Sequence, residues 1–283
     1  MLRLEGLTVT PLTDLPRFDI ALGTLLPGAD PAALAGLGWL GPDALSGGMV
    51  HLVIRSWLIR MPGVKILVDA CVGAGKDRPL RPEWHRRDGT AFLAALAAEG
   101  LEPDDIDIVF CTHLHADHVG WNTRLEGGRW VPTFRRARHL VGRREYLHWQ
   151  AAARADPAAG HGSFADSVLP VMAAGLMELV GPGFSPAPGL RLDAAPGHSP
   201  GHMVLHVDHG AGAVLCGDVL HSPVQLARPD WSSAFCSDPA RARRTRRALL
   251  AAVAARGGHL VPAHFPDPGW CRIRADGAGF RPV

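Results

Sequence analysis

The stretch Thr112-His113-Leu114-His115-Ala116-Asp117-His118 places three histidines and one carboxylate within six residues. His113 and His115 are two positions apart, so on an extended segment their side chains point the same way. A turn after them can bring Asp117 and His118 to an adjacent point, and one short loop could then serve two neighbouring metal ions. Imidazole nitrogens and carboxylate oxygens suit zinc, iron or manganese, and few protein ligands per ion keep a position open for water. The stretch therefore predicts a hydrolytic metal centre.

The residues before this loop predict how it is presented. Residues 101–112, LEPDDIDIVFCT, predict a turn and then a strand, so His113 lies at a strand's C-terminal end, where open α/β sheets bind ligands. Residues 89–100 predict a helix with Thr90 as N-cap and Gly100 as its end. Residues 49–60 and 64–72 predict two short strands joined by a hairpin at Met61-Pro62-Gly63.

The residues after the loop supply further candidate ligands. Residues 166–180 predict a short amphipathic helix, and residues 190–202 predict a strand followed by a tight turn around His198, which Gly197 and Gly201 allow. Residues 203–218 predict a hairpin that ends at Asp218, a carboxylate whose two oxygens can bridge two metals. Residues 238–257 predict a helix, with Asp238 as N-cap and Gly257 as its end, and a last strand delivers His264.

Five motifs stand in a defined order over some two hundred residues. They are Asp69 at the end of KILVDA, the loop at 113–118, His198 in APGHSPGH, Asp218 after AVLCG, and His264 in LVPAHF. This order resembles the metallo-β-lactamase superfamily. The resemblance implies an α+β fold, a four-layer αβ/βα sandwich with its metals at one edge between two sheets, and the repeated pattern of strands followed by helices fits it.

The resemblance also implies a ligand for each position of a two-metal site. His113, His115 and His198 would bind one metal, Asp117, His118 and His264 the other, and Asp218 would bridge them. The expected cofactors are two divalent ions per chain, zinc in the first place, with iron and manganese as alternatives. A water between two such ions loses its proton near neutral pH, and the resulting hydroxide is the nucleophile.

Four further residues receive expected roles. Asp117 would also pass a proton to the leaving group. The resemblance implies that Asp69 braces the metal loop without binding a metal, and an ordinary carboxylate at a strand-end turn is the alternative. His221 follows Asp218 by three residues and is a candidate to face the same cleft, where it would contact substrate or support a ligand; a purely structural role is equally open. His202 matches a position that is usually structural in the superfamily.

The expected function is a dinuclear metal-dependent hydrolase of a lactone or other small ester, most similar to the lactonase and methyl parathion hydrolase branch. The alternatives are an organophosphate or phosphodiester hydrolase and a dioxygenase with a single iron. One departure matters: quorum-quenching lactonases usually carry a Tyr near the third His or the bridging Asp that hydrogen-bonds the lactone carbonyl, and the only Tyr here, Tyr146, precedes His198.

Two regions are expected outside the common domain pattern. Residues 1–48 contain a stretch rich in Pro, Gly and Ala with weak periodicity and predict an N-terminal arm, similar to the segment that such enzymes use in homodimer contacts. Residues 49–283 form the expected domain, with an insert at about 121–165. Its aromatic residues are candidates for the wall of the substrate pocket, and plain packing is as good an explanation for each of them.

Composition limits the other partners. Lys plus Arg is 29 against 27 for Asp plus Glu, so a net charge of +2 favours neither nucleic acid nor an anionic membrane, and a small-molecule substrate is expected. The five arginines between 241 and 247 are interpreted as a solvated helix face. No secretory leader pattern and no run of eighteen apolar residues are present, which predicts a cytoplasmic protein. The five cysteines are odd in number and widely spaced, so free thiols are expected.

Overall fold

A computed structural model describes residues 1–283 and shows how strand periodicity builds the core. In strand β4 (Met49–Met61) successive side chains point to opposite faces of the sheet. Leu58 therefore belongs to one apolar cluster, while Trp57 and Ile59 belong to another. Both faces of this strand are buried, so helices must cover its sheet on one side and a second sheet on the other.

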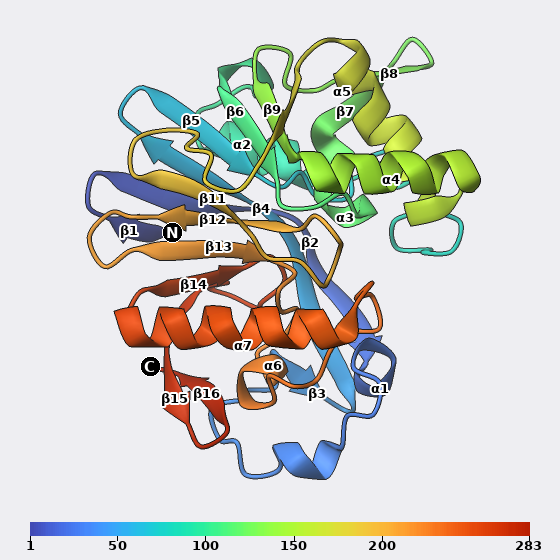
Figure 1. Ribbon diagram of the computed structural model, residues 1–283. Helices are drawn as coiled ribbons and strands as arrows, with labels where there is room; N and C mark the ends of the chain where they lie inside the picture. The colour runs from blue at the N-terminus through green and yellow to red at the C-terminus, as the bar shows by residue number, and fades with distance from the viewer.

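The first sheet has eight strands, mostly from the N-terminal half of the chain (Figure 1). Its strands in spatial order are β1 (Leu2–Leu4), β2 (Leu7–Ala21), β4, β5 (Val64–Val68), β6 (Ile108–Cys111), β9 (Arg138–Gly142) and β10 (Met177–Val180), and β3 (Leu45–Ser46) pairs with β4. The β4–β5 pair is the predicted hairpin, and β5, β6, β9 and β10 are parallel to one another. The carboxyl ends of these parallel strands therefore share one edge.

The second sheet has six strands from the C-terminal half. In order they are β11 (Leu190–Ala194), β12 (Met203–Val207), β13 (Ala213–Gly217), β14 (His259–Pro262), β15 (Cys271–Asp276) and β16 (Gly279–Pro282). One apolar cluster joins the two sheets face to face, with residues such as Phe110 and Leu140 from the first and Leu192 and Leu205 from the second. The parallel β13–β14 pair brings the ends of both strands, and so Asp218 and His264, to the same edge.

Helices cover the outer faces of both sheets. They are α1 (Leu22–Leu25), α2 (Ala91–Ala98), α3 (Ala116–Val119), α4 (Arg143–Ala155), α5 (Leu169–Ala173), α6 (Val224–Ala227) and α7 (Pro239–Arg256). Short helical turns lie at Pro31–Leu34, Pro103–Asp105, Gly120–Asn122 and Ala159–Gly162, a π-turn spans Phe164–Val168, and β7 (Thr123–Glu126) pairs with β8 (Arg129–Pro132). Phe92 and Leu96 of α2 pack on the first sheet, and Leu250 and Val253 of α7 pack on the second. The result is the predicted four-layer αβ/βα sandwich.

The predicted N-terminal arm at residues 1–48 is wrong for its first half. Residues 7–21 form β2, which pairs antiparallel with β4 along most of its length. Pro11 and Pro16 obscured the strand pattern, but beyond β1 this strand lies at the edge of the sheet, where a missing N–H is tolerated. Register shifts after Thr13 and Leu15 also break the alternation. Only residues 22–48 remain a largely irregular segment, and its contact with a second chain stays a prediction.

Two helix predictions need smaller corrections. The expected helix at 166–180 ends at Ala173, because Gly175 adopts a left-handed conformation (φ +72°) and the residues after it join the first sheet as β10. Helix α7 has the predicted bounds, with Asp238 accepting a hydrogen bond from the N–H of Arg241 and Gly257 in the left-handed conformation. Its arginines are not all solvated, because Arg246 is buried and donates to the carbonyls of Pro229 and Val219.

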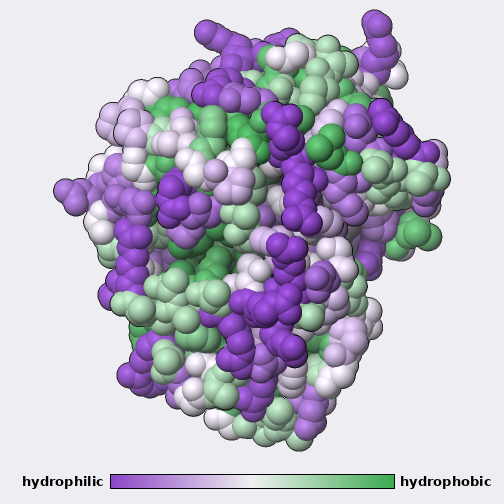
Figure 2. All heavy atoms as spheres, in the orientation of Figure 1, coloured by the Kyte–Doolittle hydropathy of each residue, from purple (hydrophilic) through white to green (hydrophobic).

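The remaining α7 arginines include the exposed Arg243 and Arg244, and Figure 2 shows hydrophilic side chains gathered over part of the face that carries this helix. All five cysteines are free thiols, as predicted. None of the helices has the length and apolar character that crossing a membrane requires.

Candidate metal centre

The loop between β6 and α3 presents the histidine-rich stretch. Asp69, at the end of β5, accepts hydrogen bonds from the backbone N–H of Thr112 (2.8 Å) and from its hydroxyl (3.0 Å), which fixes the chain where β6 ends. Asp69 itself has φ +62°, a left-handed conformation that few non-glycine residues adopt. The left-handed backbone of Asp69, the hydrogen bonds of its carboxylate and the parallel strand pair together set the direction in which His113 leaves the sheet.

Three imidazole nitrogens converge on one point of this edge. His113 Nε2 lies 3.0 Å from His115 Nδ1, and His198 Nε2 lies 3.1 Å and 2.8 Å from those two atoms. A tetrahedral zinc ion with Zn–N bonds of about 2.0–2.1 Å holds its nitrogens roughly 3.3 Å apart. The three side chains therefore fit one metal ion, although they come from two segments more than eighty residues apart.

A second group lies beside the first. Asp117 Oδ2 is 3.6 Å from His264 Nε2 and 3.8 Å from His118 Nε2. Asp117 and His118 belong to the first turn of α3, while His264 follows β14. The three ligand atoms lie within 4.8 Å of one another, which suits a second ion with an open position.

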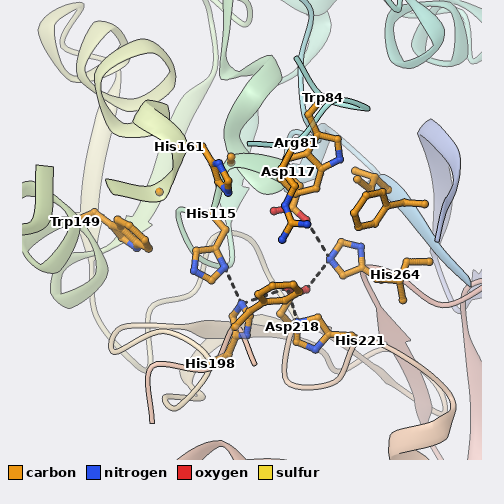
Figure 3. Close-up of a pocket in the computed structure, with 16 residues that line it drawn as sticks. Arg81, Trp84, His115, Asp117, Trp149, His161, His198, Asp218, His221 and His264 are labelled. Atoms are coloured by element: carbon orange, nitrogen blue, oxygen red, sulfur yellow. Dashed lines mark hydrogen bonds and ion pairs between the residues drawn. The ribbon is translucent and has the colours of Figure 1, made fainter. Parts of the chain in front are cut away.

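Asp218 stands between the two groups. Its Oδ1 lies 3.1 Å from His264 Nε2 and 3.4 Å from His118 Nε2, while its Oδ2 lies 3.3 Å from His198 Nε2 (Figure 3). One oxygen faces each group, which is the arrangement that a bridging carboxylate needs. His118 Nε2 and Asp218 Oδ1 are buried without a hydrogen-bond partner, and such buried polar atoms are rare unless a water or an ion satisfies them.

The structure thus brings together all seven candidate ligands. They are His113, His115, Asp117, His118, His198, Asp218 and His264. His202, expected to be structural, lies outside both groups, and its Nε2 accepts a hydrogen bond from the backbone N–H of Asp218 (3.2 Å). Burial lowers the pKa of His202 to about 3, so its ring stays neutral and able to accept.

Hydrogen bonds to residues outside the two ligand groups determine which ring nitrogen of His118 and of His264 can face a metal ion. His118 Nδ1 lies 2.9 Å from Asp69 Oδ2, and His264 Nδ1 lies 2.9 Å from the carbonyl of Val53. A carboxylate oxygen and a carbonyl oxygen act as acceptors, so Nδ1 donates in each case and the lone pair of Nε2 points into the site. Asp69 therefore occupies the bracing position that the sequence predicted.

Replacing Asp69 by Ala should weaken metal binding without removing a ligand. The variant loses the acceptor that orients His118 and holds Thr112, and the loss of such outer partners costs about 10- to 100-fold in metal affinity. Competition with a chromophoric chelator measures that affinity. Asp107→Ala is the matched control, because Asp107 accepts from the N–H of Lys65 at an exposed strand end. Equal affinity of the Asp69→Ala and control proteins would refute the bracing role.

The protonation state of the site differs between its two halves. Burial lowers the pKa of His113, and the neighbouring imidazoles, His118 first, lower it further, while burial also lowers the pKa of His198. Both rings are therefore neutral and carry a free lone pair. Burial opposes the charged form of His118 too, yet the surrounding carboxylates, Asp218 first, raise its pKa well above the usual range. A cation that binds there displaces a proton.

A pocket of about 200 Å³ opens above these groups. Its floor contains the candidate ligands His115, Asp117, His198, Asp218 and His264, together with His221. Its walls are mainly apolar and aromatic, formed by Phe18, Leu52, Ile54, Trp84, Ala116, Trp149 and Phe235, and Arg81, Gly160 and His161 complete them. In Figure 3, wall residues such as Trp84 and Trp149 lie around the side chains of the candidate ligands. The shape suits a small molecule with an apolar part.

His221 lies in this pocket as the sequence suggested. Its Nε2 is 3.3 Å from Asp218 Oδ2, and neither ring nitrogen has a hydrogen-bond partner although the residue is buried. The backbone N–H of His221 donates to Gln225 (2.7 Å), which holds the residue in place after β13. A ring nitrogen in this position can donate a hydrogen bond to a bound substrate.

Fewer aromatic residues of the insert at 121–165 line the pocket than the sequence allowed, although Gly160 and His161 also line it. Trp149 of α4 lines it, whereas Trp121, Phe134 and Phe164 pack in the apolar core. Tyr146 is also buried in the core against Phe164, so this chain has no tyrosine in the pocket. Six further pocket residues could not be predicted from the sequence: Phe18, Leu52, Ile54, Arg81, Trp84 and Phe235. They lie on segments far from the metal loop in the sequence, and no local motif marks them as part of a site.

Buried ion pairs hold the segment after Asp69 against the insert. Arg78 donates to both carboxylate oxygens of Asp166 (2.7 and 2.8 Å) and to the carbonyl of His161 (2.9 Å). Lys76 Nζ donates to the hydroxyl of Thr123 (2.6 Å), and burial lowers the pKa of Lys76 to about 7 while Asp166 acts in the opposite direction. These contacts fix the loop that carries Arg81 and Trp84 over the pocket.

Comparison with known proteins agrees with this geometry. The family described as "Metallo-beta-lactamase superfamily" matches residues 51–264. An N-acyl homoserine lactonase from Bacillus thuringiensis is 31% identical over 185 residues, which cover 60% of this chain and 64% of that protein. The chain therefore spans somewhat less than two thirds of the length of this relative.

Solved structures support the fold independently. The crystal structure of the hydrolase AbOPH, described as a member of the beta lactamase superfamily, has a TM-score of 0.83 at 23% identity and covers 100% of this chain and 95% of its own. AidC, described as a dizinc quorum-quenching lactonase, has a TM-score of 0.78 at 21% identity with the same coverage. From the family match, the motif order and the four-layer fold, we conclude that the chain belongs to the metallo-β-lactamase superfamily.

Proposed function

We propose that the protein is a dinuclear metal-dependent hydrolase of a lactone or other small ester. The position of Asp218 carries the proposal, because one of its carboxylate oxygens faces each group of candidate ligands at the floor of a largely apolar pocket. A complete second group, Asp117, His118 and His264, favours two ions over the single iron of a dioxygenase.

One ion would be held by His113, His115 and His198, and the other by Asp117, His118 and His264. Asp218 would bind both ions. We propose zinc, because the donors are imidazole nitrogens and carboxylate oxygens and the similar AidC is described as a dizinc protein. When bound, two divalent ions activate a water as nucleophile and polarise the oxygen of the scissile group.

The residues of the chain then orient the substrate and move its protons. Asp117 borders the pocket and would deliver a proton to the oxygen of the leaving alcohol. His221 has no hydrogen-bond partner for its ring nitrogens and would donate to a substrate oxygen, the task expected of a tyrosine in quorum-quenching lactonases. The apolar side chains of Trp149 and Phe235, both half-buried, would exclude water from part of the pocket and so strengthen these interactions.

The pocket favours an ester over a phosphoester. Its walls are aromatic and aliphatic, and its single arginine, Arg81, is not part of a basic groove. The relatives described as lactonases act on N-acyl homoserine lactones. This chain lacks a tyrosine in the pocket, so the proposal names a lactone or other small ester and no particular lactone. An organophosphate hydrolase with the same ions is the second candidate, since the two-metal chemistry is shared.

Metal analysis coupled to turnover tests the proposal. We expect about two zinc, manganese or iron ions per chain after purification without chelator. Hydrolysis of lactones or aryl esters should disappear on removal of the metal and return on its addition, because the ligands supply no other nucleophile. A panel with an aryl phosphotriester ranks the two candidate functions. A single iron without hydrolysis, or no bound metal at all, would contradict the proposal.

Two expectations about the whole protein stay predictions. The first is a homodimer through the segment at residues 22–48, which sedimentation velocity of the intact chain and of a variant altered in that segment would test. The second is a cytoplasmic location, which fractionation of the source cells would test. Nothing in the net charge of +2 favours a nucleic-acid partner.

A further inference from the structure

Arg81 places a positive charge in the wall of the pocket. The residue lies in the segment between β5 and α2 and is half-buried, and in Figure 3 it lies with His161 on the side of the pocket opposite His198 and His221. Because the same cavity borders Arg81 and the candidate metal ligands, one small molecule bound there contacts both.

Aromatic rings hold the guanidinium in place. Its central carbon lies 5.7 Å from the ring centroid of Trp84, 5.5 Å from that of Phe235 and 6.0 Å from that of Phe18. Cation–π contacts of this kind attract the guanidinium without neutralising it or using its N–H groups. The three rings also displace water, so the charge acts in surroundings where a bound anion would be attracted more strongly than in bulk water.

The guanidinium of Arg81 has no acceptor within the protein. No carboxylate lies within 4.0 Å of it, and it makes no hydrogen bond to another residue. The buried arginines behave differently, because Arg78 is paired with Asp166, and Arg246 donates to two carbonyls and the hydroxyl of Ser232. Arg81 therefore keeps five N–H donors and a full charge available to a ligand.

We propose that Arg81 binds a carboxylate of the substrate that lies away from the scissile bond. The proposal rests on the proposed function and narrows it: the preferred substrate is an ester or lactone that carries a free carboxylate. A guanidinium suits this group because its planar fork can donate two parallel hydrogen bonds to the two carboxylate oxygens. Phe18, Trp84 and Phe235 would pack against the carbon chain that joins the carboxylate to the ester.

A pair of esters that differ only in charge tests the proposal. The metal-loaded protein is assayed with the para-nitrophenyl monoester of glutaric acid, which keeps one carboxylate, and with the same ester methylated at that carboxylate. We expect the wild type to prefer the acid. In Arg81→Met the ratio of kcat/KM for the acid to that for the methyl ester should fall about 10- to 100-fold, as expected for a hydrogen bond to a charged group. Arg81→Lys should recover part of the preference.

The control variant is Arg136→Met, which removes the same charge from an exposed arginine outside the pocket and should keep the wild-type ratio. A merely structural role of Arg81 would lower turnover of both esters together and leave their ratio unchanged. That result, or a wild type without preference for the acid, would overturn the proposal.

A binding measurement separates this proposal from the proposed function. Calorimetric titration of the metal-loaded protein uses glutaranilic acid, the amide analogue of the acid ester, and its methyl ester. If neither glutarate ester is hydrolysed, the anion site still stands when the acid binds more tightly than its methyl ester and Arg81→Met removes the difference. A difference that persists in Arg81→Met would assign the carboxylate to the metal ions and refute the role of Arg81.

Discussion

Asp218→Ala should reduce the metal content from about two ions per chain to one or none, and hydrolysis should fall by roughly a thousandfold or more. The substitution removes the only carboxylate that faces both groups of candidate ligands, with oxygens 3.1 Å from His264 Nε2 and 3.3 Å from His198 Nε2. Without the ions, the pKa of the water is not lowered toward neutrality, so little hydroxide exists at neutral pH. Metal analysis and initial rates measure the two effects.

The backbone should tolerate this change. The N–H of residue 218, which donates to His202 Nε2, is retained in the variant, so the end of β13 keeps its position. Asp208→Ala is the matched control, since Asp208 is an exposed carboxylate on the hairpin after β12 that pairs with Arg256. The control should bind two ions and keep its rate. If Asp218→Ala also binds two ions and keeps the wild-type rate, the assignment of Asp218 as the bridging ligand is wrong.

Gly120→Ala should lower the free energy of unfolding by about 3 kcal/mol and the Tm by roughly 5–10 °C, a large effect for the addition of one methyl group. Gly120 has an ordinary helical conformation (φ −56°), so any residue could adopt its backbone angles. The constraint is space, because a Cβ atom there would overlap the carbonyl group of Val72. The N–H of Gly120 also donates to Cys71 O at 2.7 Å, so the two segments cannot separate without losing this bond.

Thermal unfolding of the metal-loaded protein, with Gly23→Ala as control, measures this effect. Gly23 lies in the short helix α1, its added Cβ meets no atom within 4 Å, and Ala is the better helix former, so the control should keep or slightly raise Tm. Because Gly120 follows His118 by two residues, the variant should also bind its metals less tightly. An unchanged Tm for Gly120→Ala would show that the close approach of residues 72 and 120 is not needed.

The local part of the site could be predicted from the sequence. His113, His115, Asp117 and His118 lie within six residues, and a strand followed by a turn leaves them few ways to point apart. Strand ends were also predictable, because apolar runs that stop at Asp69 and Asp218 mark where chains leave a sheet. The order of these motifs along the chain supplied the family and the four-layer fold.

Other features depended on contacts between distant segments. Two prolines and two register shifts hid β2, whose strand conformation is held mainly by its long pairing with β4. The arginines of α7 look alike in the sequence, yet Arg246 alone among them is fully buried, because the segment between β13 and α7 offers it three acceptors. Trp149 faces the pocket, whereas Trp121 packs in the core. The packing of the surrounding elements decides this difference, and the positions of the two residues in the sequence do not reveal it.

The sequence by itself thus determined the four candidate ligands of the loop at 113–118, since their spacing is a local property. The order of its motifs, through the resemblance to a known family, supplied the fold class and the other candidate ligands. Only the tertiary structure placed the Asp218 carboxylate between two groups of ligands and set Arg81 among three aromatic rings above them. The physical reason is that the direction of a side chain on an irregular segment is decided by the elements packed against it, and these lie far away in the sequence.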